Sequence, residues 1–323
     1  MRNVVKIGSA LATLFLTAAG ACGQIAATFK GHQNTISCLA FSADGKTLAS
    51  GAKDGVVILW DVATGKARAQ LPGHKDMVAA VAFAPDGKRL ASASHGPDIL
   101  IWDVSAAKQA GVLRGHVKDV RGLAFSPDGK TLASAGVDKT VRLWDWNEAK
   151  ELRRLEGHLA EVNCVAFAPD GKRLASGGWD QTVRLWGLDG QALQVLKGHT
   201  EFVRDLAWAP DGKALLSSGK DGPIRIWNAG NGELRLKLEG HQGLVRSLSL
   251  SADGRTLASA GRDGTLNLWD LASGKVVATM EEGVLGFQVV AFSPDGKALA
   301  TGGIGRAVTL WDVAGVREQH RVK

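Results

Sequence analysis

The sequence predicts an all-β fold, a ring of seven four-stranded antiparallel sheets, from three observations. Tryptophan recurs at positions 60, 102, 144, 186, 227, 269 and 311 of the 323 residues, in steps of 42 with one step of 41. Gly-His pairs recur in the same steps, with their histidines at 32, 74, 116, 158, 199 and 241. Glycine occurs 41 times and tyrosine never, and so much glycine favours tight turns between short strands.

Each element of a repeat can be justified from its third copy. An alternating apolar run after the Gly-His pair predicts the first strand, and Asp128-Gly129 supplies the hairpin turn that ends it. A second turn at Val137-Asp138 separates the next two strands, and a more variable strand leads to the following Gly-His pair. The four predicted strands are 120–125, 131–135, 140–144 and 151–155.

The two chain ends predict how the ring closes. Sheets of this kind cannot bury both faces alone, so they stack around an axis as blades of a propeller. Residues 24–30 match the fourth-strand pattern, whereas only ten residues follow Val313 and they contain no Gly-His pair. We therefore expect the N-terminal segment to supply the outer strand of the last blade, which removes an open sheet edge.

The paired Gly-His and Trp-Asp marks resemble the WD40 repeat family over residues 24–313. This resemblance implies a single seven-bladed WD40 propeller. It also implies a hydrogen-bonded network of histidine, serine, aspartate and tryptophan inside each blade. The complete sets are His32, Ser50, Asp54 and Trp60; His116, Ser134, Asp138 and Trp144; His158, Ser176, Asp180 and Trp186; His199, Ser217, Asp221 and Trp227; His241, Ser259, Asp263 and Trp269.

These recurring Ser, His and Asp residues are interpreted as structural. A catalytic triad is built once per active site, whereas this set recurs with the structural period. A buried indole N–H, imidazole and hydroxyl each need a partner, and one carboxylate completes the set. Two blades depart from the pattern: the second has Gly96 in place of aspartate, and the seventh has Gly283, Thr301 and Gly305, so its network is expected to be absent.

The N-terminus predicts an export signal. Residues 1–21 combine basic Arg2 and Lys6, an apolar stretch of 7–18 and the small residues 19–21 before Cys22. This resembles a bacterial secretory signal peptide, so residues 22–323 form the mature propeller, periplasmic or secreted. Cys22 also fits a lipoprotein processing box, and both ordinary cleavage and a lipid anchor at Cys22 stay open. With a lipidated Cys22, only Gly23 would separate the membrane from the closing strand.

Several function classes are excluded by what the sequence lacks. Three cysteines at 22, 38 and 164 build neither a disulfide framework nor a zinc site. Phosphate loops, nucleophile elbows, metalloprotease helices and calcium loops are missing, so no catalytic residue, metal or cofactor is predicted. The formal charge of +7 is interspersed with Asp and Glu, and nucleic-acid binding is not expected.

Function is therefore expected on the faces of the ring. The WD40 resemblance implies docking on the top face, from which the His-bearing loops and Asp-bearing turns emerge. Three positions per blade reach this face in the family, and in this chain they carry aromatic and cationic residues mainly over blades 4 to 6. The predicted partner-binding residues are Trp179, Phe202, Arg204, Lys220, Leu244, Arg246 and Arg262, with Met77, Arg121, Glu161, Lys53 and His95 at equivalent positions elsewhere.

The resulting prediction is a monomeric, non-enzymatic interaction scaffold. Aromatic anchors beside several cations suit a protein or peptide segment that is both apolar and acidic. The alternative is a small-ligand binder, hydrolase or dehydrogenase that uses the central channel. That alternative needs acids, histidines or metal ligands to converge on the pore.

Overall fold

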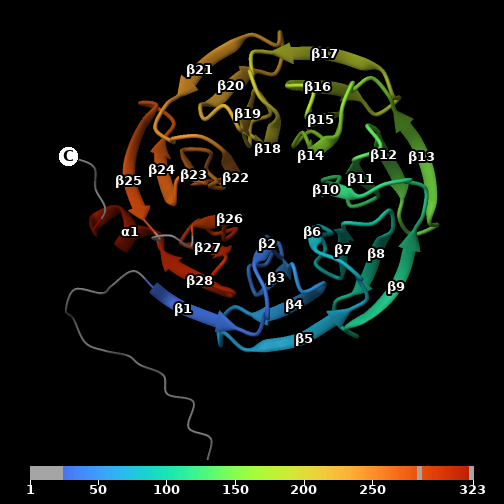
Figure 1. The fold of residues 1–323 in the computed structure, drawn as a ribbon, viewed down its shortest axis with the longest axis horizontal. Helices are drawn as coiled ribbons and strands as arrows, with labels where there is room; N and C mark the ends of the chain where they lie inside the picture. The colour runs from blue at the N-terminus through green and yellow to red at the C-terminus, as the bar shows by residue number, and fades with distance from the viewer. Residues whose placement is uncertain (1–24, 282–285, 320–323) are drawn as a thin grey trace, which may run out of the picture.

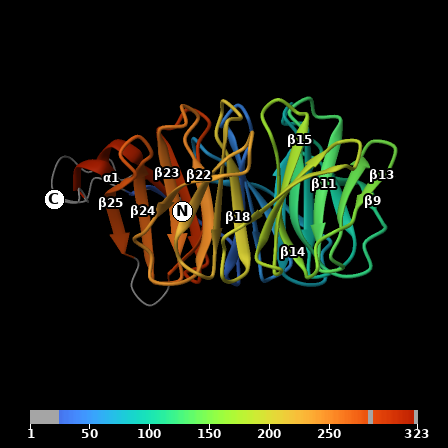
Figure 2. The same cartoon turned by 90° about the horizontal axis from the view of Figure 1, so that it is seen from above.

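The computed structural model describes residues 25–281 and 286–319, which form seven four-stranded antiparallel sheets around a central axis (Figure 1). Seen from the side, the blades stand next to one another in a flat disc (Figure 2). The fold class predicted from the sequence is confirmed. The expected signal peptide and the possible modification site at Cys22 lie outside the described residues.

The first four blades follow the repeat order, with the innermost strand first. Blade 1 contains β2 (Ile36–Phe41), β3 (Thr47–Ala52), β4 (Val56–Asp61) and β5 (Ala67–Pro72). Blade 2 contains β6 (Val78–Phe83), β7 (Arg89–Ser94), β8 (Ile99–Asp103) and β9 (Lys108–Leu113). Blade 3 contains β10 (Val120–Phe125), β11 (Thr131–Gly136), β12 (Val141–Asp145) and β13 (Lys150–Leu155). Blade 4 contains β14 (Val162–Phe167), β15 (Arg173–Gly178), β16 (Thr182–Gly187) and β17 (Ala192–Lys197).

The last three blades complete the ring. Blade 5 contains β18 (Val203–Trp208), β19 (Ala214–Gly219), β20 (Ile224–Asn228) and β21 (Leu234–Leu238). Blade 6 contains β22 (Val245–Leu250), β23 (Thr256–Gly261), β24 (Thr265–Asp270) and β25 (Lys275–Glu281). Blade 7 contains β26 (Phe287–Phe292), β27 (Ala298–Gly303), β28 (Ala307–Asp312) and, as its outer strand, β1 (Ile25–Lys30).

The pairing of β1 with β28 confirms the predicted closure by the N-terminal segment. The two strands are antiparallel, with Lys30 opposite Ala307. Phe29 of β1 is fully buried and its ring centroid lies 5.5 Å from that of Trp60 in blade 1. Closure therefore adds apolar burial between the last and first blades as well as hydrogen bonds.

The core lies between blades rather than within them. Trp144 of blade 3, for example, packs in one buried cluster with Ala91, Ile99 and Ile101 of blade 2. Because each large side chain fills the gap to its neighbour, the blades stabilise one another around the ring.

The innermost strand of every blade contains a β-bulge at the same place. In blade 3 Val120 pairs with Gly136 and Gly122 pairs with Ala135, so Arg121 is an extra residue without a partner across the ladder. Bulges of this kind redirect a side chain from the plane of the sheet. The bulged residues of blades 1 to 7 are Ser37, Ala79, Arg121, Asn163, Arg204, Arg246 and Gln288, and all seven line the central channel.

A short C-terminal helix is the element that the repeat pattern did not predict. Helix α1 (Val313–Gln319) follows β28 and buries Val313 and Val316 in the apolar cluster of blades 6 and 7. It contacts β25, the outer strand of blade 6. No helix of the described residues is long and apolar enough to cross a membrane.

Candidate functional site

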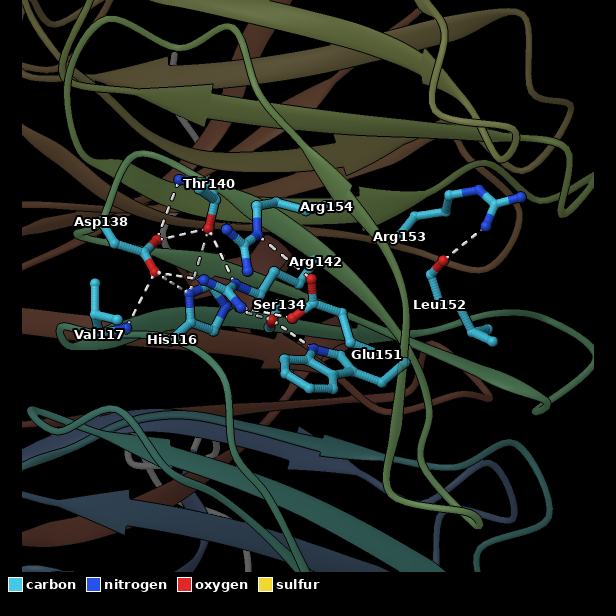
Figure 3. A network of polar contacts seen from close by, with 11 residues as sticks. His116, Val117, Ser134, Asp138, Thr140, Arg142, Glu151, Leu152, Arg153 and Arg154 are labelled. Carbon is cyan, nitrogen blue, oxygen red and sulfur yellow. Dashed lines mark hydrogen bonds and ion pairs between the residues drawn. The ribbon is translucent and has the colours of Figure 1, made fainter.

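The hydrogen-bond network of blade 3 joins β11, β12 and β13 to the loop before β10 (Figure 3). His116 Nε2 lies 2.7 Å from Ser134 Oγ, and Trp144 Nε1 donates to the same oxygen at 2.8 Å. His116 Nδ1 lies 2.8 Å from Asp138 Oδ2. A carboxylate only accepts, so Nδ1 carries the proton and the serine hydroxyl donates to Nε2. Every polar group of the set is thereby satisfied in a buried environment.

The same geometry recurs in blades 1, 4, 5 and 6. The histidine Nε2 lies 2.7 Å from the serine in each of the four, and its Nδ1 lies 2.9 or 3.0 Å from the nearest aspartate oxygen. Burial alone would raise the pKa of Asp138, but hydrogen bonds from His116 and Thr140 hold that pKa well below its usual range. The networks thus contain ionised aspartates that are committed to structural contacts.

Each network also fixes the loop that forms the top face. The aspartate accepts a hydrogen bond from the backbone N–H of the residue after the histidine, for example from Val117 at 3.2 Å and from Leu159 at 2.9 Å. The side chain at this position points away from the network, and Val117 and Leu159 are 76% and 78% exposed. The top face is therefore presented on a rigid frame.

In blade 2, Gly96 and Pro97 replace the aspartate and the residue that follows it in the complete blades. His74 and Trp102 both contact Ser92, at 2.6 and 2.7 Å, but the aspartate position is Gly96. The next residue is Pro97, where blades 3 and 4 have Lys139 and Gln181 at φ of 70° and 65°. Proline cannot adopt positive φ, so this turn has a different path. Burial then lowers the pKa of His74 to about 4, which the charge of Asp98 only partly opposes.

Blade 7 corrects one prediction from the sequence. Its network is not entirely absent, because Trp311 Nε1 donates to Thr301 Oγ1 at 2.8 Å. The threonine hydroxyl replaces the serine of the other blades. Gly283, which stands at the histidine position, lies outside the described residues.

In blades 1, 2, 4, 5 and 6, the residue before the aspartate position lies next to the residue before the first strand, and a backbone hydrogen bond joins the two. The backbone N–H of Trp179 donates to Glu161 O, that of Lys220 to Phe202 O, and that of Arg262 to Leu244 O. Lys53 and His95 bond in the same way to Thr35 and Met77 of blades 1 and 2. The alignment of these positions from repeat to repeat thus corresponds to one recurring backbone geometry.

An aromatic stack crosses the top face from blade 3 to blade 5. The rings of Trp179 and Phe202 stack with centroids 4.8 Å apart and an interplanar angle of 10°. The Arg121 guanidinium lies over the Trp179 ring at 5.6 Å, and Lys220 Nζ lies 5.9 Å from the Phe202 centroid. Cations therefore cap the pair, and Trp179, 45% exposed, offers its edge rather than an open face.

Polar contacts hold this stack in place. Trp179 Nε1 donates to Asn163 Oδ1 at 3.0 Å, and Arg121 donates to the same oxygen at 3.1 Å. Arg121 also pairs with Glu161 at 2.7 Å. The stack is preorganised, which reduces the entropy lost when a partner binds.

The three predicted arginines of blades 5 and 6 form a separate group. Arg204, Arg246 and Arg262 have no ion pair or hydrogen bond to another side chain among the described residues. Burial lowers the pKa of Arg246, and the charges of Arg204 and Arg262 lower it further. Of the predicted residues, Trp179, Phe202 and Lys220 thus contact one another. The three arginines form a second group, whose members interact through their charges. Half-buried Leu244 lies beside Arg262.

Sequence reasoning missed three residues of this surface, Val117, Leu159 and Asn163. Val117 and Leu159 are apolar where the other complete blades have Gln33, Thr200 and Gln242, and this contrast was visible in the sequence. Asn163 holds Trp179 within blade 4, and Arg121 reaches it from blade 3, a contact between neighbouring blades that no repeat alignment could show. Arg121 and Glu161 were assigned to the top face, but not to the stack.

The central channel offers little for the alternative function. Asp205 is the one acidic residue that lines it among the described residues, and no histidine does. No group of three histidine, cysteine, aspartate or glutamate side chains that could hold a metal occurs in residues 25–281 and 286–319. Cys38 and Cys164 are buried, and burial raises the pKa of the Cys38 thiol to about 12.

Comparison with known proteins agrees with this architecture. The chain matches the family model "WD domain, G-beta repeat" at residues 23–61, 65–103, 107–145, 149–187, 190–228, 232–270 and 276–312. The class is thus a WD-repeat β-propeller, whose members are usually non-enzymatic scaffolds for protein interactions. The chain belongs to the WD40 repeat family.

Three relatives illustrate similarity over short segments of the chain. The chain is 51% identical over 43 residues to the small ribosomal subunit protein RACK1z of Arabidopsis thaliana, which covers 13% of each protein. It is 49% identical over 43 residues to the RACK1 protein of Candida albicans, covering 13% of this chain and 14% of the relative. It is 56% identical over 34 residues to human WD repeat-containing protein 18, covering 10% and 8%.

Proposed function

We propose that the protein is a non-enzymatic scaffold whose top face, over blades 3 to 6, binds a protein segment that is both apolar and acidic. The observation that carries this proposal is the capped stack of Trp179 on Phe202 beside the unpaired Arg204, Arg246 and Arg262. Rigid aromatic groups and arginines are the residues that dominate binding energy at interfaces.

The exposed apolar side chains extend this surface. Val117 and Leu159 protrude from loops whose backbones the blade networks hold. An apolar part of the partner would cover blades 3 and 4, and its acidic part would lie over blades 5 and 6. The order of apolar and acidic residues along the bound segment should therefore decide which of its ends lies over blades 3 and 4.

The experiment is a selection of peptides from a random display library on the immobilised mature chain. We expect enriched peptides to combine Asp or Glu with apolar residues. Binding of a synthetic consensus peptide should weaken at least ten-fold in Trp179→Ala and Phe202→Ala, since a central aromatic contact contributes about 2 kcal/mol or more. Lys53→Glu, at the turn position of blade 1, is the matched control and should bind within two-fold of the original chain.

Two results of this selection would overturn the proposal. If no peptide is enriched, or if the enriched peptides bind Trp179→Ala and Phe202→Ala as tightly as the original chain, the top face of blades 3 to 6 is not the docking surface. Circular dichroism and urea unfolding of each variant would establish that it is folded.

Export is also part of the proposal, on the strength of the pattern of residues 1–22. Expression in a bacterium followed by mass spectrometry of the mature N-terminus tests it. A chain that begins at or near Cys22 supports export, and an added lipid mass on Cys22 supports a membrane anchor. A chain that retains residues 1–21 would contradict both.

A further inference from the structure

The bulged residues create a ring of side chains inside the channel. One residue per blade, at the bulge of each innermost strand, borders a cavity of about 290 Å³. Most of the ring is uncharged: Ser37, Ala79, Asn163 and Gln288 carry no charge. Arg121, Arg204 and Arg246 are its charged members, and they differ in how they are neutralised.

Arg121 is already neutralised within the protein. Its guanidinium lies 2.7 Å from Glu161 and donates to Asn163, so both its charge and its geometry are used in the stack. It does not need a further anion. This leaves the cationic character of the channel to blades 5 and 6.

Arg204 and Arg246 are adjacent in the ring and form no ion pair among the described residues. Each is half-buried, and Arg246 Nε is inaccessible to solvent without a hydrogen-bond partner. Arg262 adds a third positive charge close by, and the neighbouring cations and burial lower the pKa of Arg246. Keeping like charges together in a partly buried place costs free energy unless an anion joins them.

Asp205 does not supply that anion. Asp205 is half-buried and lines the same cavity, but its carboxylate accepts backbone hydrogen bonds from Leu206 at 2.9 Å and Leu248 at 2.8 Å. Burial raises its pKa to about 6, a shift that the charge of Arg204 partly opposes, and no ion pair joins the carboxylate to an arginine. Its lone pairs thus hold blade 5 to blade 6, and the guanidinium groups stay free.

We propose that Arg204 and Arg246 form an oxyanion site in the channel, which takes one carboxylate or phosphate group. Guanidinium groups bind these groups through paired N–H donors, and the cavity volume suits a single group or a short side chain. The proposal rests on the proposed function in that the site would receive the acidic part of the docked segment. The same chemistry would also accept a free inorganic or small organic anion.

The first experiment uses free anions. The mature chain is titrated with inorganic phosphate and with succinate at constant ionic strength, and binding is followed by calorimetry and by the unfolding midpoint. If a free anion suffices, we expect saturable binding that weakens at least ten-fold in Arg204→Gln and in Arg246→Gln. Arg246→Lys should recover part of the affinity. Lys53→Gln, which removes an exposed top-face cation, is the matched control and should leave the affinity within two-fold.

The second experiment tests an anion carried by the partner. The consensus peptide from the display selection is compared with a version in which Asp and Glu are replaced by Asn and Gln. If the partner supplies the group, the loss from neutralising the peptide should be at least ten-fold in the original chain and nearly absent in Arg204→Gln plus Arg246→Gln.

The outcomes separate this site from the docking surface. Peptide binding that depends on Trp179 and Phe202 but not on either arginine, together with no phosphate or succinate binding, overturns the oxyanion site and leaves the proposed function standing. Anion binding that needs both arginines without any peptide binding supports the site and overturns the docking proposal. Unchanged anion and peptide affinities in both glutamine variants overturn the site. Removing one of two repelling charges should leave the variants at least as stable as the original chain, which urea unfolding would check.

Discussion

Blades 2 and 3 have the same strands and the same register, yet their polar networks differ. In blade 3 Asp138 joins His116, Thr140 and Arg142, and it also accepts the N–H of Val117. In blade 2 the histidine contacts serine alone. The comparison teaches that one carboxylate accepts a hydrogen bond from a buried histidine, orders a turn and positions a surface loop.

Removing that carboxylate from blade 3 is expected to have the largest effect. Asp138→Ala should lower the free energy of unfolding by about 3 kcal/mol, because His116, Thr140 and buried Arg142 lose a charged partner. Urea unfolding at pH 7 measures this. Asp128→Ala, in the exposed turn at the other end of β11, is the control and should cost clearly less. A loss below about 1 kcal/mol for Asp138→Ala would mean that the network contributes little beyond the packing of the blades.

Acidification should act on blade 2 next. The pKa of His74 is about 4 in the folded state and 6.5 in its ordinary state. The unfolded chain therefore binds the proton more readily than the folded chain. The contribution of neutral His74 to the free energy of unfolding is fully present above pH 6.5 and decreases as the pH falls towards 4. Between pH 7 and 5 this histidine alone would cost up to about 2 kcal/mol.

The check is urea unfolding at pH 7 and pH 5 for the original chain and for His74→Gln. The glutamine keeps a hydrogen-bonding group near Ser92 but does not titrate, so the decrease with pH should be smaller in the variant. Equal decreases in the two proteins would show that His74 is not protonated on unfolding in this range.

Converting blade 2 to the blade 3 pattern should give a smaller gain. Gly96→Asp together with Pro97→Gly permits the positive φ that the turn needs and returns a carboxylate to His74, which should add about 1 kcal/mol to the free energy of unfolding. Gly96→Asp alone should add less, because Pro97 still prevents the turn. Nuclear magnetic resonance titration of His74 should show its pKa rise only in the double variant. A full gain from the single substitution would disprove the role assigned to Pro97.

Blade 7 gives the smallest expected effect. Thr301→Ser keeps the hydroxyl that accepts from Trp311 Nε1 and should change the free energy of unfolding by less than about 0.5 kcal/mol. Thr301→Val, of nearly equal shape, should cost about 1 kcal/mol because the indole N–H is left without an acceptor. Thermal unfolding of both variants distinguishes them. Equal stability of the two would mean that the hydroxyl is not needed in blade 7.

The strand pattern could be predicted because the same apolar alternation and turn residues recur from repeat to repeat. The predicted second strand 131–135 ends one residue before β11 (Thr131–Gly136), and the predicted third strand 140–144 is shifted by one residue from β12 (Val141–Asp145). The helix α1 (Val313–Gln319) was missed because it lies after the last repeat, where no copy exists to compare. Its stability comes from burying Val316 against blades 6 and 7, a tertiary contact.

The candidate surface was predictable only as a set of positions. Trp179 and Phe202 could be assigned to the top face, but their stacking depends on the approach of two blades from repeats 41 residues apart at their tryptophans. Likewise the missing aspartate of blade 2 could be seen at Gly96. The consequence of Pro97 becomes visible when its turn is set beside those of Lys139 and Gln181.

The sequence by itself determined the number of blades, the strand order within each, the closure by the N-terminal segment and the members of the five complete polar networks. All of these depend on periodicity and on the residues of local turns, which recur in the repeats of this one chain. Only the tertiary structure decided which charges are neutralised. Arg121 meets Glu161 and Asn163 across a blade boundary, whereas Arg204 and Arg246 project from equivalent bulges and form no ion pair with a carboxylate among the described residues. The reason is that ion pairing depends on distances between neighbouring blades, and the repeat pattern of a single blade does not contain them.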